Sequence, residues 1–227
     1  MKLGLILPSF AMTAEPALEL AQRCADHGID GVFAYDHLWP MNNPARPALA
    51  PFPLLGAIAQ AHPNLWVGPL VARIGLVDDE VLLSQFRALS TIAPNRVIAA
   101  MGTGDKLSAE ENLAYGVPFA PAEERRRSLE HCARIAQAEG LEVWIGGGAA
   151  PTVALAERLG AALNLWQAEP EKVAAHAAHG PVTWGGTLPD DDTGARALLE
   201  GLRDAGATWV AIGGVSAPER LLDLASG

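Results

Sequence analysis

The sequence predicts an α/β protein with one domain, a (β/α)8 TIM barrel over residues 1–227 with short loops and few insertions. Short apolar runs alternate with longer amphipathic stretches along the whole chain, which is typical of βα units around a parallel sheet. Eight such units can be counted, as in a TIM barrel, whereas open doubly wound sheets usually have about five or six strands. The first apolar run continues as LILPSFAM, without the GxGxxG turn of a dinucleotide-binding unit.

The apolar runs predict strands at residues 3–7, 31–35, 65–71, 96–101, 142–145, 161–166, 181–186 and 208–213. The amphipathic stretches predict helices within residues 14–28, 51–62, 78–93, 121–140, 150–160, 170–180, 192–206 and 217–227. Several of these helices have proline near the first turn and glycine at the end, which are the usual helix boundaries. The longest connection runs from Gly102 to Ala120, and SAEENLAYG within it predicts a short helix.

Charge and cysteine content exclude several classes of protein. The formal net charge is −10 and lysine is scarce, whereas nucleic acids and anionic membranes require clustered positive charge. Cys24 and Cys132 have no metal-ligand or disulfide spacing and are expected to be buried thiols. Neither a signal peptide nor an apolar run of about 18 residues is evident, so we expect a soluble cytoplasmic protein that binds a small molecule.

The stretch VFAYDHLWP, residues 32–40, ends a predicted strand in polar and aromatic residues. Loops after the carboxyl ends of barrel strands build the active site, so Asp36 and His37 are candidate functional residues. An aspartate there can hold the polar edge of a ring, and a histidine can exchange a proton near neutral pH. Trp39 could form an apolar wall for the substrate. The alternative is a structural turn in which Asp36 binds loop amides and His37 has no function.

The fourth predicted strand exits as MGTGD, residues 101–105, with Ser108 shortly after. Glycines on both sides of Thr103 let the backbone approach a ligand closely, and the hydroxyl and amide groups can donate to an anion or a ring carbonyl. Asp105 is expected on the same rim as His37. An ordinary glycine-rich turn would explain the same residues.

Three consecutive glycines, residues 146–148, follow the fifth predicted strand and lead directly into a helix. Free amides and the positive end of the helix dipole converge at such a point, where a phosphate could bind. The alternative is a βα loop that merely needs positive φ values.

Arg73 follows the third predicted strand in LVARIGLVDDE and is a candidate contact for an anionic substrate or cofactor. The alternative is an ion pair between Arg73 and nearby Asp78 or Asp79.

Taken together, these segments resemble the luciferase-like monooxygenase superfamily, particularly its branch that uses the 8-hydroxy-5-deazaflavin coenzyme F420. The similar stretches are KLGLILPSF, GIDGVFAYDHLWP, LWVGPLVARIGLVDDEVLLSQFRALSTIAPNRVIAAMGTGD, AYGVPFAPAEERRRSLEHC and VWIGGGAAPTVALAERLGAALNLW. They cover most of residues 1–166 in the family's order, and the rest of the chain resembles the family loosely. The family fold is a TIM barrel, which agrees with the count of eight units.

The resemblance implies functions for individual residues. Asp36 would hydrogen-bond the deazaflavin ring, and His37 would be the proton donor or acceptor near the hydride-transferring carbon. Asp105 stands where F420-dependent sugar-phosphate dehydrogenases have an acidic catalytic partner. The other implied cofactor contacts are Val71 and Ala72 near a non-proline cis peptide at the end of the third strand, Thr103, Gly104 and Ser108 after the fourth, and Gly147, Gly148, Ala149, Pro151 and Thr152 around the phosphate.

We therefore expect an F420-dependent oxidoreductase that transfers a hydride between the deazaflavin and a small organic substrate. One alternative is an FMN-dependent monooxygenase or reductase of the same superfamily, supplied with reduced flavin by a separate reductase. Another is a non-catalytic flavin- or deazaflavin-binding protein. Lysines that would clamp a sugar phosphate after the later strands are missing, so that substrate is not expected. A homodimer is expected, in which a second subunit could close a site that the short loops leave open.

Overall fold

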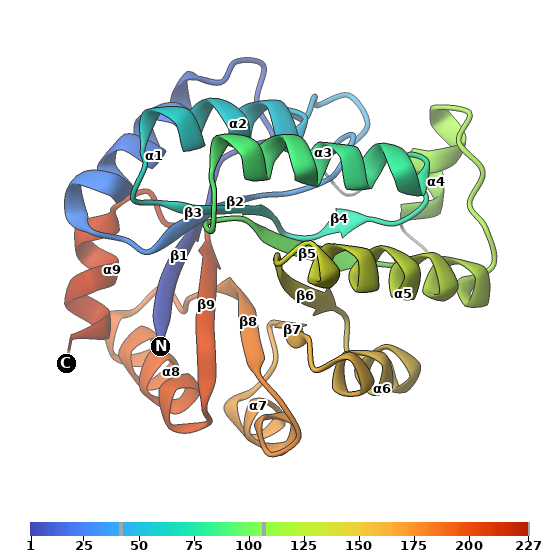
Figure 1. Cartoon of the computed structure of the whole chain (residues 1–227). Coiled ribbons are helices and arrows are strands. Elements are labelled where there is room, and N and C mark those ends of the chain that lie inside the picture. The colour runs from blue at the N-terminus through green and yellow to red at the C-terminus, as the bar shows by residue number, and fades with distance from the viewer. Residues whose placement is uncertain (41–42, 106–107, 227) are drawn as a thin grey trace.

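The computed structural model describes residues 1–40, 43–105 and 108–226, and it shows a ring of parallel strands with helices outside it (Figure 1). The strands in these ranges are β1 (Lys2–Ile6), β2 (Gly31–Ala34), β3 (Trp66–Pro69), β4 (Ala72–Arg73), β5 (Ile98–Gly102), β6 (Glu142–Gly146), β7 (Ala162–Trp166), β8 (Val182–Thr187) and β9 (Ala207–Gly213). The helices in these ranges are α1 (Glu15–His27), α2 (Pro51–Ala61), α3 (Asp79–Ile92), α4 (Ser108–Ala114), α5 (Ala122–Ala138), α6 (Ala150–Leu159), α7 (Pro170–Ala177), α8 (Asp192–Asp204) and α9 (Pro218–Ala225). Gly227, the last residue of the predicted final helix, lies outside the described residues.

The strand pairing confirms the predicted TIM barrel. The order around the sheet is β3-β2-β1-β9-β8-β7-β6-β5-β4, and all these pairings are parallel. The ring closes between β3 and β5, where Val67 and Val97, the residue before β5, form an isolated parallel bridge. The Val67 amide also donates to the Arg96 carbonyl at 2.9 Å. The carboxyl ends of all strands therefore face one rim, where chemistry is found in this fold.

The third predicted strand, residues 65–71, is wrong in its extent, because β3 ends at Pro69 and the strand that follows, β4, begins at Ala72 with another neighbour. The Leu70 amide donates to the Ala34 carbonyl at the end of β2, whereas the Ile74 amide donates to Gly102 at the end of β5. Two short strands, β3 and β4, thus replace one. The peptide bond between Leu70 and Val71 is cis and does not involve proline, at the place that the resemblance implied.

Two βα connections are long, not only the fourth one. Residues 35–50 join β2 to α2 and contain Pro40, Pro44 and Pro47. Proline lacks the amide proton and has a fixed φ, and the described residues of this segment, 35–40 and 43–50, form neither helix nor strand. The segment is nevertheless anchored near the rim, because the Leu49 amide donates to the Ser9 carbonyl at 2.8 Å.

The helices pack on the barrel through apolar faces with helical spacing. In α1 the buried residues are Ala17, Leu20, Ala21 and Cys24, which recur at every third or fourth position and so share one face. Burial of each leucine of this kind contributes about 1.5–3 kcal/mol. Cys24 is a free buried thiol, as predicted, and burial raises its pKa to about 12. Cys132 in α5 is likewise buried and free.

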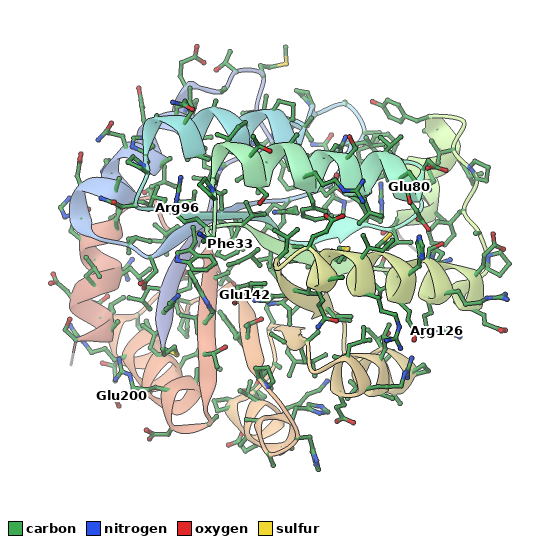
Figure 2. All side chains as sticks on the ribbon, in the orientation of Figure 1. Phe33, Glu80, Arg96, Arg126, Glu142 and Glu200 are labelled. Atoms are coloured by element: carbon green, nitrogen blue, oxygen red, sulfur yellow. The ribbon has the colours of Figure 1, made fainter. Side chains whose placement is uncertain are left out.

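Large aromatic side chains fill the barrel itself. Phe33 lies inside the ring of strands, as Figure 2 shows, with its ring centroid 5.3 Å from that of Trp144. A β-carbon at Gly4 would lie 2.5 Å from the Phe33 ring, so glycine in β1 makes room for this packing. Trp209 completes the aromatic cluster, 5.7 Å from Trp144.

The amino edge of the barrel is closed by Lys2, whose Nζ lies 4.4 Å from the centroid of the Trp66 ring. A hollow of about 490 Å³ lies on this edge, lined by residues of β6, β7 and β9, far from the rim where this fold places chemistry. None of the helices in the described part of the chain combines the length and apolarity that a bilayer crossing needs.

Candidate active site

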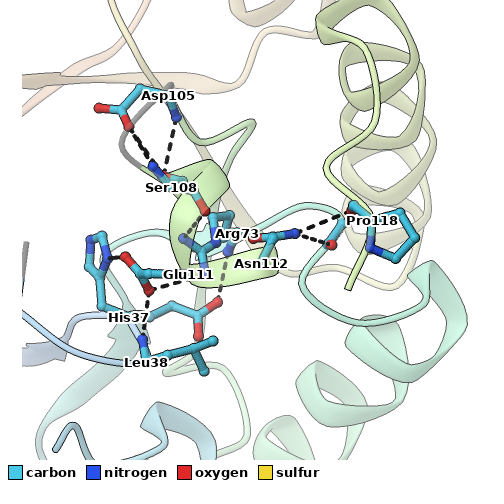
Figure 3. A network of polar contacts seen from close by, with 10 residues as sticks. His37, Leu38, Arg73, Asp105, Ser108, Glu111, Asn112 and Pro118 are labelled. Carbon is cyan, nitrogen blue, oxygen red and sulfur yellow. Dashed lines mark hydrogen bonds and ion pairs between the residues drawn. The ribbon is translucent and has the colours of Figure 1, made fainter. Parts of the chain in front are cut away.

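The carboxyl ends of β2, β4 and β5 bring together one polar network (Figure 3). In this view the Glu111 carboxylate lies between His37, Leu38 and Arg73, and Ser108 lies beside Asp105. The members are Asp36, His37 and Leu38 after β2, Arg73 in β4, and Asp105, Ser108, Glu111 and Asn112 after β5. The sequence had placed Asp36, His37, Arg73, Asp105 and Ser108 at these strand exits but had assigned no function to Glu111.

Asp36 ties the exit of β2 to β4. Its Oδ2 accepts a hydrogen bond from the Arg73 amide at 2.8 Å. The carboxylate therefore binds a backbone amide, as in the structural alternative for Asp36. Burial raises the pKa of Asp36 above its ordinary value, and the Arg73 amide and guanidinium offset this only in part. Carboxyl groups with such a perturbed pKa on a barrel rim are candidates for functional sites.

His37 is held by a carboxylate from the fourth connection. Its Nδ1 lies 2.7 Å from Oε1 of Glu111, whose side chain is 2% exposed against 25% for His37. Burial raises the pKa of Glu111, but the contact with His37, the hydrogen bond from the Leu38 amide and the nearby Arg73 guanidinium outweigh it and lower the pKa overall. Glu111 is thus an ionised partner on one side of the ring, and the other ring nitrogen is directed away from it.

Arg73 points into this network and not toward the start of α3. Its Nη2 lies 3.3 Å from Oε2 of Glu111, and its side chain is 4% exposed. The alternative pairing with Asp78 or Asp79 is wrong for Asp78, which instead caps α3 by accepting from the Glu80 amide at 2.9 Å. The Nε atom of Arg73 is buried and has no hydrogen-bond partner among the described residues. A buried arginine of this kind stabilises the Glu111 carboxylate and is not exposed as an anion clamp.

Ser108, at the start of α4, is hydrogen-bonded to Asp105. The Ser108 amide and hydroxyl both donate to Oδ1 of Asp105, at 3.1 and 3.3 Å. Asp105 is exposed and Ser108 is buried. Asp105 therefore stands on the rim, as expected, while the carboxylate bonded to the His37 ring is that of Glu111.

A neighbouring part of the rim is lined by small residues under Val71. A β-carbon at Gly102 would lie 2.7 Å from Cγ2 of Val71, and one at Gly146 would lie 3.0 Å from Cγ1. Val71 thus covers the exits of β5 and β6. Ala72 is buried in β4, where it pairs with Met101.

Thr103 and Gly104 continue from β5 along the rim. The Thr103 carbonyl accepts from Nε of the buried Arg125 at 2.7 Å, which fixes the backbone of this turn. Gly104 has φ +66°, a conformation that favours glycine. The Thr103 side chain is partly exposed and is available to a ligand on the rim.

The glycine bend after β6 has the donors that a phosphate needs. The Gly147 amide donates a hydrogen bond to the Asn164 carbonyl at 3.1 Å. Gly147 and Gly148 are exposed. Helix α6 then begins without a side-chain cap at Ala149. Pro151 has no amide proton and the Thr152 amide donates to the Ala149 carbonyl at 2.9 Å, so the donors offered to an anion here are the amides of Gly148, Ala149 and Ala150. Pro151 is exposed in the first turn and Thr152 is buried behind the bend.

Lys172 adds a positive charge to this bend, which the sequence reading had missed. Its Nζ lies 3.1 Å from the position that a β-carbon on Gly148 would take. Lys172 lies in the first turn of α7. The cation is therefore supplied by the unit of β7 and α7, which follows the glycine bend in the chain. Exposed glycines, an uncapped helix and a lysine together fit a phosphate group, whereas the rim offers no such set near His37 in the described residues.

Aromatic rings border the rim beside His37. Phe10 and Tyr35 stack with centroids 5.4 Å apart, and Trp166, which is half exposed, meets Tyr35 edge-on at 6.0 Å. Tyr35 also lies 6.4 Å from the His37 ring. Trp39, the expected substrate wall, is buried and packs on Tyr115 of the fourth connection at 5.7 Å.

The fold and rim define a class of protein, and comparisons confirm the resemblance to luciferase-like and F420-dependent proteins. No protein-family model matches the chain. A curated relative, an F420-dependent glucose-6-phosphate dehydrogenase of Nakamurella multipartita, is 27% identical over 129 residues, covering 56% of this chain and 36% of the relative. The chain thus matches about a third of the length of that relative.

Solved structures share the fold over nearly the whole chain. An F420-dependent secondary alcohol dehydrogenase in complex with an F420-acetone adduct has a TM-score of 0.80 at 14% identity, covering 99% of this chain and 96% of that one. The oxygenating constituent of 3,6-diketocamphane monooxygenase from Pseudomonas putida, in complex with FMN, has a TM-score of 0.65 at 16% identity, covering 88% and 71%.

Proposed function

We propose that this protein is an F420-dependent oxidoreductase that transfers a hydride between the deazaflavin and a small organic substrate, with His37 as proton donor or acceptor. The observation that carries the proposal is the 2.7 Å contact between Nδ1 of His37 and Glu111, which leaves the other ring nitrogen of a partly exposed imidazole directed away from the carboxylate on the barrel rim. A histidine held in this way is suited to general acid–base chemistry. Similarity to F420-dependent proteins over 56% of the chain supports the choice of cofactor.

The residues of the rim fit such a cofactor. When bound, F420 supplies the hydride chemistry, and the protein supplies position and electrostatics. Asp36, Val71 and Thr103 would hold the ring, and the bend at Gly148 with Lys172 would hold the phosphate. The partly exposed His37 would move a proton at the substrate.

The substrate is proposed to be small and without a phosphate group. Arg73 is 4% exposed and paired with Glu111, so it is not available as an anion clamp. Lys172 lies beside the glycine bend, where it would serve the cofactor. The aromatic residues Phe10, Tyr35 and Trp166 offer instead an apolar surface that suits an uncharged substrate.

The test is turnover of small alcohols and ketones with oxidised and reduced F420 by the wild type and by His37→Ala. General acids and bases typically contribute about 100-fold or more, so a loss of at least that size is expected. His131→Ala on the exposed face of α5 is the control and should keep full activity. A His37→Ala variant that stays within about 10-fold of the wild type contradicts the proposed role of His37.

FMN chemistry is the second candidate, favoured by the fold shared with a monooxygenase that was solved with FMN. In that case a separate reductase would supply the reduced flavin. Absorbance and fluorescence of the purified protein with each cofactor separate the two functions. A protein that binds either cofactor but turns over no substrate would indicate the third alternative, a non-catalytic binding protein.

A further inference from the structure

The two oxygens of Glu111 face different kinds of partner. Oε2 lies 2.8 Å from the Leu38 amide and 3.3 Å from Nη2 of Arg73. A backbone amide and a guanidinium can only donate hydrogen bonds, so the atom at this position must be an acceptor. Oε1 faces Nδ1 of His37 at 2.7 Å, and this imidazole nitrogen can either donate or accept, depending on the tautomer.

The ionised state of Glu111 decides whether Nδ1 donates or accepts. An ionised carboxylate accepts at both oxygens and has no proton to donate, so the proton between Oε1 and the ring must be on Nδ1. Arg73 balances the negative charge of Glu111 within the buried part of the network, and His37 does not have to be cationic to compensate a buried charge.

Helix α4 holds Glu111 in this position. Its buried residues Ser108, Glu111 and Asn112 share one face, and Asn112 Nδ2 donates to the Gly75 carbonyl at 3.0 Å and to Pro118 at 3.3 Å. The bond to Gly75 ties the helix to the loop after β4, and the bond to Pro118 fixes the segment that follows α4. Glu111 therefore reaches His37 from an element that is anchored independently of the histidine.

We propose that Glu111 is a positioning residue that fixes His37 in the Nδ1–H tautomer, so that Nε2 carries the lone pair that takes up the proton in the reaction. The catalytic part of this inference rests on the proposed function, whereas the tautomer itself does not. The resemblance implies an acidic catalytic partner at Asp105 and assigns no role to Glu111, which is the carboxylate that contacts the ring.

Glu111→Gln gives a sharp test because both oxygens of a carboxylate accept hydrogen bonds, whereas an amide accepts through its oxygen and donates through its NH2 group. The amide oxygen must face the two donors, Leu38 and Arg73, and this turns the NH2 group toward His37. The ring can accept that hydrogen bond only through a bare Nδ1, so the variant is expected to hold the Nε2–H tautomer. Glu110→Gln on the exposed face of α4 removes the same charge and should leave the tautomer unchanged.

The measurement is nitrogen NMR of 15N-histidine-labelled full-length protein without cofactor, which distinguishes protonated from bare ring nitrogens. The neutral His37 ring should be Nδ1–H in the wild type and Nε2–H in Glu111→Gln. An Nε2–H ring in the wild type, or no change in the folded variant, overturns the inference. If the variant does not fold, the wild-type tautomer alone decides.

Turnover with F420 separates this inference from the proposed function. Glu111→Gln is expected to lower turnover at least about 10-fold, since a base in the wrong tautomer cannot accept the proton. A reversed tautomer with undiminished turnover would leave the positioning of the ring supported and contradict the role of His37 in the reaction.

Discussion

The Asp36 carboxylate accepts a hydrogen bond from the Arg73 amide at 2.8 Å and joins two strand exits of the barrel. Burial raises the pKa of this carboxyl above its ordinary value of 3.8. The folded protein therefore keeps the Asp36 proton over a pH range in which the unfolded chain has already released it. As the pH rises from 3.8 toward the raised value, this carboxyl lowers the free energy of unfolding.

Asp36→Asn should remove that pH dependence while keeping an acceptor for the Arg73 amide. Relative to the wild type, the free energy of unfolding of Asp36→Asn should increase between about pH 3 and pH 7. Urea unfolding at several pH values measures it. Asp190→Asn at an exposed position is the control. A difference that falls with pH would contradict the raised pKa.

Gly102→Ala should destabilise the rim through Val71. The added β-carbon would lie 2.7 Å from Cγ2 of Val71, and overpacking of this kind costs about 1–3 kcal/mol. Val71→Ala in the same chain should recover part of the loss, as a double-mutant cycle in denaturant would show. Gly56→Ala in α2 would meet only Ile92 Cδ1 at 3.6 Å and should be neutral or stabilising. Equal effects of the two glycine substitutions would rule out the crowding by Val71.

Lys172→Met should weaken the binding of a phosphate-bearing cofactor. An exposed charge pair contributes about 0.2–1 kcal/mol, which corresponds to a loss of affinity of up to about fivefold. The difference from the wild type should shrink with added salt, because exposed charges are screened. Lys2→Met at the amino edge changes the same charge far from the rim. Fluorescence titration in low and high salt measures both variants, and a similar loss in each would show that Lys172 acts only through net charge.

The barrel and part of its rim could be predicted because they depend on local patterns. Each apolar run forms a strand that ends at the carboxyl rim. Asp36 and His37 directly follow the second run, so they had to lie on that rim. The division of the third strand could not be predicted, since LWVGPLV is one continuous apolar run. This run pairs with β2 as far as Pro69, whereas the next strand, Ala72–Arg73, pairs with β5, and that choice is made by closure of the barrel.

Glu111 and Lys172 were missed for a similar reason. Glu110 and Glu111 are adjacent on a short helix, and only the helix phase, with Ser108 and Asn112 buried, distinguishes the one that faces inward. The sequence does not reveal that phase, because the buried residues of α4 are polar and its leucine, Leu113, is 68% exposed. Lys172 lies beyond β7 in the chain, and its approach to Gly148 depends on how α7 packs beside α6, which no local pattern specifies.

The most direct test of the central claim is a fluorescence titration of the purified protein with F420 and with FMN, for the wild type and Asp36→Ala in parallel. If the rim around Asp36 and His37 holds a deazaflavin, F420 should bind saturably, more tightly than FMN, and more weakly to the variant. Tight binding of FMN with no response to F420 would contradict the proposed function.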